Sequence, residues 1–163
     1  SAIAGESRTA VANYLLLTAA AYTVGSVFFG TVGSAAPMKT FKVGLVISVA
    51  MFALLAGGVR TGLWAILPVY GFCAISAALA YAVLTPLFPP EMTGRVNTAS
   101  NVLMFGFSFA FQWGIGAVLR NYPVTDGRYA PEGYATALWI LVALQLASLA
   151  WLLPMRSSQA ARA

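Results

Sequence analysis

The chain alternates between long runs of apolar residues and short segments that hold its charged side chains. A helix needs about 20 residues to cross a hydrocarbon core of about 30 Å, and about 17 is the lower limit. Four of the uncharged runs exceed that length, and the second run, 43–59, lies near the limit. We therefore expect five transmembrane helices, at about 14–36, 43–59, 63–85, 96–119 and 134–154.

No run alternates apolar and polar residues with period two, which disfavours a membrane β-barrel. The expected fold is an all-α polytopic bundle in which residues 1–163 form a single transmembrane domain. Proline, glycine and charged residues mark the expected loops, which are 37–40, 57–62, 86–91 and 121–133.

Composition supports a membrane environment. Hydrophobic residues make up 60% of the chain and charged residues 8%, against about 25% charged residues in soluble domains. A soluble fold near 150 residues still exposes roughly a third of its unfolded surface, so it has no place for this much apolar area. The net charge of +5 comes from basic residues scattered singly, so we expect a lipid bilayer and no nucleic acid as partner.

The basic residues also predict an orientation. Alternating helices divide them into two groups, with Lys39, Lys42, Arg95, Arg156 and Arg162 on one side and Arg8, Arg60, Arg120 and Arg128 on the other. Cytoplasmic loops carry an excess of Lys and Arg. The first group is slightly larger, so we expect it and the tail 156–163 in the cytoplasm.

The chain lacks the parts for most catalytic sites. It has one cysteine, Cys73, and no histidine, and its four acids are far apart in sequence. A zinc site or a Ser-His-Asp triad therefore has no ligands or base, and we expect no metal, no cofactor and no enzyme activity. Cys73 is expected to be a small buried hydrophobe. All four acids also lie outside the apolar cores, so an intramembrane proton carrier is not expected in this chain.

The fourth run carries a stripe of polar side chains. Asn97, Asn101, Ser108 and Gln112 are spaced four, seven and four apart, which places them along one face of a helix. Because a carboxamide costs free energy in hydrocarbon unless it is hydrogen-bonded, this face is expected to meet the bundle interior or a watery cavity. Two roles stay open: interhelical hydrogen bonds worth about 0.6 kcal/mol each, or the lining of a substrate path by Asn101, Ser108 and Gln112.

Several aromatic and amide residues are weaker candidates for a substrate path. Tyr22 and Tyr81 are the first of these, followed by Tyr70, Trp113 and Gln145. Aromatic side chains in membrane helices also serve as packing residues and interfacial anchors, so that alternative stays open.

Glu91 and Arg95 stand four residues apart where the fourth helix is expected to begin. They are candidates for an ion pair that gates the cytoplasmic loop, together with Asn97, although exposed pairs stabilise by only about 0–1 kcal/mol. Small residues favour close helix packing, and they recur at Gly106, Ala110, Gly114 and Ala117, and at Gly25, Gly30 and Gly33.

Two stretches of the chain carry a family resemblance: FPPEMTGRVNTASNVLMFGFSFAFQWGIGAVL and NYLLLTAAAYTVGSVFFGTVG. Through them the chain resembles the C-terminal half of a major facilitator superfamily (MFS) transporter. The first is similar to the loop and helix that join spans ten and eleven in bacterial members, and the second resembles span eight and the loop after it. The resemblance makes the five helices spans eight to twelve, and it implies a bacterial inner membrane and an N-terminal half not present here.

This resemblance implies that the chain is part of a secondary active transporter that moves a small solute by alternating access. One family pattern is missing: Gly30 is not followed by the Gly-x-x-x-Asp-Arg latch, because residues 31–35 contain neither an acid nor an arginine. The alternative is therefore a non-transport subunit, or an assembly or packing factor of a larger membrane complex, derived from a transporter half.

Overall fold

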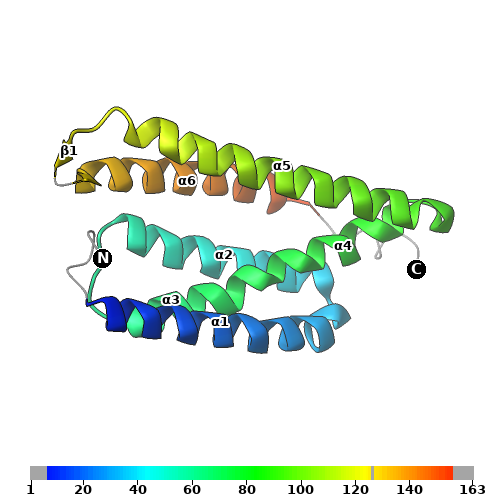
Figure 1. Ribbon diagram of the computed structural model, residues 1–163. Coiled ribbons are helices and arrows are strands. Elements are labelled where there is room, and N and C mark those ends of the chain that lie inside the picture. Colours follow the sequence, from blue (N-terminus) through cyan, green and yellow to red (C-terminus); the bar gives the residue numbers. More distant parts are fainter. Residues whose placement is uncertain (1–6, 126, 156–163) are drawn as a thin grey trace.

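The computed structural model describes residues 7–125 and 127–155 (Figure 1). Five helices in this part of the chain are long and apolar enough to cross a membrane. The structure thus confirms the predicted all-α helical bundle and the predicted number of spans. The predicted cytoplasmic tail, 156–163, lies outside the described residues.

The helices follow the predicted order with shifted ends. They are α1 (Arg8–Thr31), α2 (Pro37–Ala56), α3 (Leu63–Ala74), α4 (Leu79–Leu84), α5 (Thr93–Leu119) and α6 (Pro131–Leu152). Four short 3₁₀ segments connect them: η1 (Gly33–Ala35), η2 (Ile75–Ala78), η3 (Thr85–Leu87) and η4 (Pro90–Met92). Within the predicted loop 121–133, β1 (Val124–Thr125) and β2 (Arg128–Tyr129) form a minimal antiparallel hairpin.

The helix starts are set by local capping. The Ser7 Oγ accepts a hydrogen bond from the Ala10 amide at 3.1 Å, so α1 begins earlier than the apolar run. The predicted loop 37–40 is wrong, because these residues form the first turn of α2. Pro37 occupies the first helical position, where its missing amide hydrogen costs nothing. The second span is therefore 20 residues long and is not short for a membrane.

The tight turn predicted at 57–62 is confirmed. Gly58 has a φ of 77° and Gly62 a φ of 80°, a left-handed conformation that glycine adopts without steric cost. The Val59 amide donates to the Leu54 carbonyl oxygen at 3.1 Å and closes the end of α2.

Glycines bring the backbones of α1 and α3 together. A Cβ atom added to Gly25 would lie 2.6 Å from the Phe72 carbonyl oxygen, and one added to Gly71 would lie 2.9 Å from the Thr18 carbonyl oxygen. The expected packing role is thereby confirmed for Gly25 but not for Gly30, where an added Cβ meets nothing within 4 Å. Such close approach is the main source of helix association in lipid, where apolar burial between helices contributes little.

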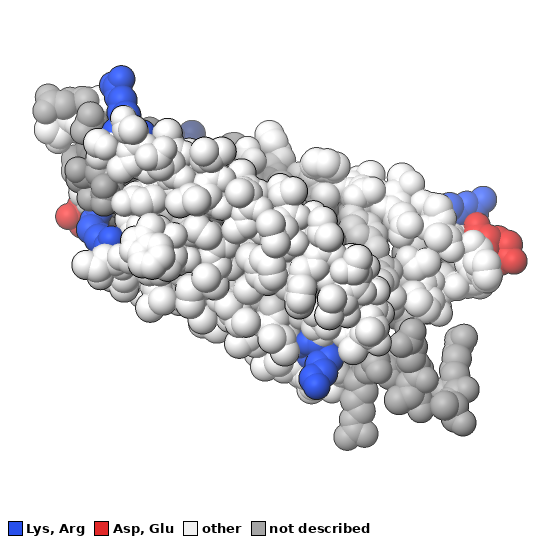
Figure 2. All heavy atoms as spheres, turned by 90° about the horizontal axis from the view of Figure 1, so that it is seen from below, with Lys and Arg blue, Asp and Glu red and all other residues white. Residues whose placement is uncertain are grey.

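On the face shown in Figure 2, acidic and basic side chains lie at the left and right ends of the molecule, and a further basic group lies at the lower edge, short of the right end. A broad uncharged belt separates the left-hand group from the others. Such a belt is what a hydrocarbon core requires, because a charge at the bilayer centre costs at least about 2.5 kcal/mol.

Lys42 joins the base of α2 to the end of α6. Its Nζ donates to the Leu153 carbonyl oxygen at 2.8 Å and also to that of Met155. The last carbonyl groups of a helix lack intrahelical partners and carry partial negative charge, so an ammonium group there is stabilising. The sequence predicted only a topogenic charge at this position.

The α1–α3 contact leads to a first prediction. Gly25→Ala should destabilise the chain by about 1–3 kcal/mol, because the methyl group meets a backbone oxygen that has no room to move. Gly30→Ala, in the same helix, is the matched control and should change stability by less than about 1 kcal/mol, in the stabilising direction. Thermal unfolding in detergent micelles measures both; equal effects would contradict the close contact.

The Lys42 cap leads to a second prediction. Lys42→Met keeps the length of the side chain and removes its charge, and it should lower the free energy of unfolding by about 1–2 kcal/mol. Lys39→Met is the control, because Lys39 also lies near the start of α2 and its side chain is exposed. The same detergent assay applies, and a Lys39→Met effect as large as that of Lys42→Met would overturn the assigned cap.

Candidate functional site

The polar face of α5, which we define as Asn97, Asn101, Ser108 and Gln112, is the candidate site. With 27 residues, α5 is about 40 Å long, more than the hydrocarbon core of about 30 Å. Ser108 lies about 17 Å from one end of this helix and about 23 Å from the other. The face therefore runs from the membrane edge to the middle of the span.

Two hydrogen bonds attach the first part of this face to the third span, and we call them the junction. The Tyr81 hydroxyl donates to Asn101 Oδ1 at 2.5 Å. The Thr85 hydroxyl donates to Asn97 Oδ1 at 3.2 Å. Here the structure brings together three predicted candidates, Tyr81, Asn97 and Asn101. Thr85 was missed, and its only signal was its position where Pro86 ends the apolar run.

The second part of the polar face has no such partner within the described chain. The Ser108 hydroxyl donates to the Met104 carbonyl oxygen of its own helix at 2.8 Å, and the side chains of Ser108 and Gln112 are exposed. In the apolar part of this span only 6% of the residues are buried, whereas 28% are buried in the third span. Of the two expected environments, the bundle interior is therefore not found for Ser108 and Gln112 within the described residues, and a watery cavity stays a prediction.

The neighbouring outer side of α5 is apolar and strongly exposed. Phe105 is 69% exposed, Phe109 72% and Trp113 66%. Phe109 lies about 100° around the helix from Ser108. Contact with lipid acyl chains is favourable for these large apolar side chains and unfavourable for the polar face. Trp113, a weaker path candidate, belongs to this apolar side of the helix.

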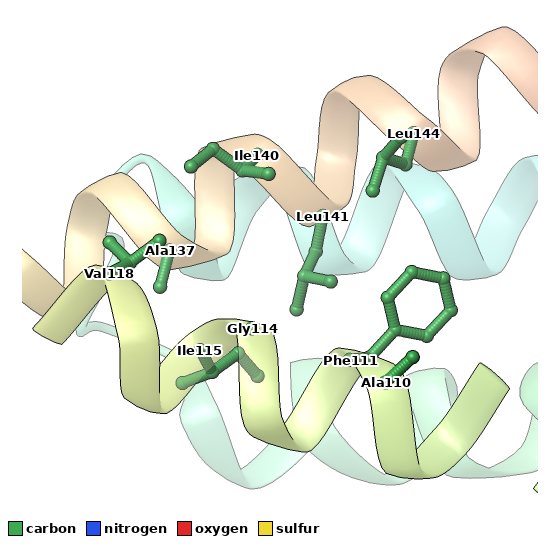
Figure 3. A pocket seen from close by; sticks show the side chains of 9 residues that line it. All are labelled: Ala110, Phe111, Gly114, Ile115, Val118, Ala137, Ile140, Leu141 and Leu144. Carbon is green, nitrogen blue, oxygen red and sulfur yellow. The ribbon is translucent and has the colours of Figure 1, made fainter. Parts of the chain in front are cut away.

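A cavity of about 170 Å³ lies between α5 and α6 (Figure 3). Its lining is apolar: Ala110, Phe111, Gly114, Ile115, Val118, Ala137, Ile140, Leu141 and Leu144. None of the predicted path residues lines it. Because no polar side chain lines it, this cavity does not suit a polar solute.

The remaining path candidates are dispersed. Tyr22 is 47% exposed on α1 and takes no part in the two hydrogen bonds of the junction. Tyr70 stacks on Phe52 with ring centroids 5.7 Å apart, which is a packing contact. Gln145 has a buried Oε1 with no hydrogen-bond partner among the described residues. Cys73 is 5% exposed, which confirms its predicted burial.

The loop candidates and Gly106 are open to the surroundings, whereas Ala110 and Gly114 line the cavity between α5 and α6. Glu91 lies in η4 and Arg95 in the first turn of α5, and both side chains are exposed. A Cβ atom added to Gly106 or Gly114 meets nothing within 4 Å. The predicted close approach of another helix at these two glycines is therefore not made within the described chain.

The junction leads to a third prediction. Tyr81→Phe and Asn101→Leu should each lower the free energy of unfolding, and the double variant should lose less than the sum of the two. We expect a coupling energy of about 0.6 kcal/mol and at most about 1.7 kcal/mol, the range for hydrogen bonds between membrane helices. Tyr22→Phe paired with Asn101→Leu is the additive control; the same coupling in both cycles would contradict the junction.

Comparison with known proteins leaves the identity of the chain open. No family model, no curated protein and no solved structure matches it. The similarity to MFS transporters therefore remains an expectation drawn from sequence motifs.

Proposed function

We propose that the chain is one helical unit of a secondary active transporter, and that the polar face of α5 lines the route of a small solute. In this proposal a second membrane unit, on the same polypeptide or another, closes the route from lipid. The solute passes between the two units as they rock about a central site.

The observation that carries the proposal is the exposure of Ser108 and Gln112 in the part of α5 that crosses the membrane. An amide without a hydrogen-bond partner costs several kcal/mol in hydrocarbon. Contact with acyl chains is therefore the least favourable environment for Gln112. Water or a polar solute satisfies both its donor and acceptor groups.

The position of the polar face supports the same function. Its first part is fastened to the third span by the junction, and its second part continues toward the membrane centre. Polar groups that converge near the midplane are where transporters bind their solutes. Carboxamides and hydroxyls orient a solute by hydrogen bonds without the desolvation cost of a buried charge.

We also propose a bacterial inner membrane as the location, on the MFS resemblance, with Lys39, Lys42 and Arg95 at the cytoplasmic side. The excess of basic residues at that end supports this orientation. It places the junction near the cytoplasmic end of the membrane and the tail 156–163 in the cytoplasm.

A second candidate function is a non-transport subunit of a larger membrane complex. The open position at Gly106 favours it, because a small residue allows the backbone of a neighbouring helix to approach, whereas Gly114 lines the cavity between α5 and α6. Ala110, between them, lies about 180° around α5 from Asn101, so the small residues and the polar face point in opposite directions. In this alternative, helices of a partner protein cover the polar face and leave it dry.

Water accessibility gives the fourth prediction. In a Cys73→Ala background, Ser108→Cys and Gln112→Cys should react with a membrane-impermeant thiol reagent about tenfold faster than Phe109→Cys. The reactive form is the thiolate, which hydrocarbon disfavours and water supports. Phe109 is the matched control, because it neighbours Ser108 and is more than two-thirds exposed. The measurement uses the chain in its native membranes.

Two results would contradict this transport proposal. Equal rates at all three positions would show that the polar face is no wetter than the lipid-facing side. Slow reaction at Ser108 and Gln112 in membranes, with fast reaction in detergent, would favour a face covered by partner helices. If the labelling succeeds, unchanged solute uptake after Gln112→Ala would remove that residue from the route.

A further inference from the structure

Helices α5 and α6 are packed tightly at the end where the chain passes from one to the other. A Cβ atom added to Gly133 would lie 2.9 Å from Tyr122 Cγ and 3.2 Å from Leu119 Cδ2. The hydroxyl groups of Tyr122 and Thr136 form a hydrogen bond of 2.7 Å. Together these contacts fix the distance between the two helices at this end.

The two helices separate beyond this contact. In Figure 3 the ribbons of α5 and α6 lie close together at Val118 and Ala137 and farther apart at Phe111 and Leu144. The cavity of about 170 Å³ occupies the space that results. A Cβ atom added to Gly114, on the cavity wall, meets nothing within 4 Å, so the described chain leaves this space unfilled.

The cavity is open to an apolar molecule from the side. Three of its lining residues are partly exposed: Phe111 is 43% exposed, Ile140 44% and Leu144 47%. Phe107 stacks on Phe111 with ring centroids 6.2 Å apart and extends the apolar wall along α5. A molecule that enters between these side chains therefore meets apolar surface on both helices.

The chemistry and size of the cavity narrow the choice of occupant. Its lining side chains are all apolar, and a buried water molecule needs about two to four polar partners. Apolar protein cavities of about 150 Å³ stay dry and bind apolar molecules. A helix is about 10 Å in diameter, so the cavity has no room for a further helix. The occupant that fits is a single narrow apolar chain.

The cavity also lies within one leaflet of the bilayer. Arg120 follows the last residue of α5, Leu119, and marks the edge of the hydrocarbon core, because a charge inside the core is costly. The lining residues from Val118 to Ala110 lie about 2–14 Å from Leu119 along the axis of α5. One leaflet contributes half of the core, about 15 Å. Phospholipid acyl chains run alongside the helices over this depth.

We propose that the cavity between α5 and α6 binds one acyl chain of a membrane phospholipid. The acyl chain fills the space that the two helices leave open and so stabilises their contact on the membrane side of Gly133. Gly114 and Ser108 lie about 120° apart around α5, so the acyl chain and the polar face occupy different sides of the helix. The inference therefore does not depend on the proposed function.

Native mass spectrometry of the full chain, purified in detergent, tests this binding. Dioleoyl phosphatidylglycerol is titrated, and the dissociation constant of the first lipid adduct is measured. Gly114→Leu and Ala110→Leu each place a side chain in the cavity and should raise this constant about tenfold, because the acyl chain loses apolar contacts there.

Gly106→Leu is the matched control and should leave the dissociation constant unchanged. An added Cβ at Gly106 also meets nothing within 4 Å, but this residue does not line the cavity. Equal effects of Gly106→Leu and Gly114→Leu would overturn the proposal, because the lipid would then bind elsewhere on α5. If Gly114→Leu fails to fold, Ala110→Leu decides, and unchanged affinity in that folded variant would overturn the proposal.

Dihexanoyl phosphatidylglycerol distinguishes the acyl chain from the headgroup. It carries the same headgroup on much shorter chains, which bury less apolar surface, so it should bind at least about tenfold more weakly. Equal affinity for the two lipids would contradict acyl-chain binding, since the headgroup would then account for the adduct. A dimer of the chain without bound lipid, dissociated by Gly114→Leu, would instead show that a second copy covers the cavity.

Thermal unfolding in the same detergent gives an independent readout. A ligand that binds the folded state raises the unfolding temperature by mass action. Dioleoyl phosphatidylglycerol should therefore raise the unfolding temperature of the unsubstituted chain and of Gly106→Leu more than that of Gly114→Leu. The same rise in all three would argue against the cavity as the lipid site.

Discussion

Close contact between helix backbones organises this bundle. In lipid, apolar side chains gain little by turning from acyl chains to one another, so helices associate mainly through van der Waals packing and hydrogen bonds. Gly25 and Gly71 supply that packing between α1 and α3, and Gly44 supplies it between α2 and η2. These contacts set the direction of the third span. Its far end then lies where Tyr81 and Thr85 reach α5.

Helix α5 lacks such a close backbone contact at two of its glycines. Its glycines at 106 and 114 have open space beside them, so no backbone of the described chain approaches there. The helix is joined to the third span by two side-chain hydrogen bonds at one end, and at the other it packs on α6 beside a cavity and at Gly133. Hydrogen bonds of this kind contribute about 0.6 kcal/mol each, and α5 belongs to the span with the smallest buried share of the five. A polar face on so little buried a helix is open to water, a solute or a partner helix.

The sequence was sufficient to predict the features that depend only on keeping charges out of the hydrocarbon core or on local backbone geometry. Charges stay out of the apolar core, so their spacing located all five spans, and the glycines at 57–62 located a turn whose geometry glycine favours. The loop predicted at 37–40 was wrong because Pro37 was treated as a helix breaker, although it starts α2. The Lys42 cap depends on residues 111 and 113 positions away, which no local pattern encodes.

The candidate site was predicted in part for a related reason. Helical spacing identified the polar face of α5, because periodicity is a local property. Its hydrogen bonds to Tyr81 and Thr85 depend on where the third span ends, and this span is interrupted at η2. That interruption leaves no trace in hydropathy, since Ile75–Ala78 is small or apolar throughout. It needs a neighbour that buries its backbone and presents no side chain, and Gly44 meets both conditions. The course of the third span and the junction are therefore properties of two helices together, which is why one span alone predicts neither.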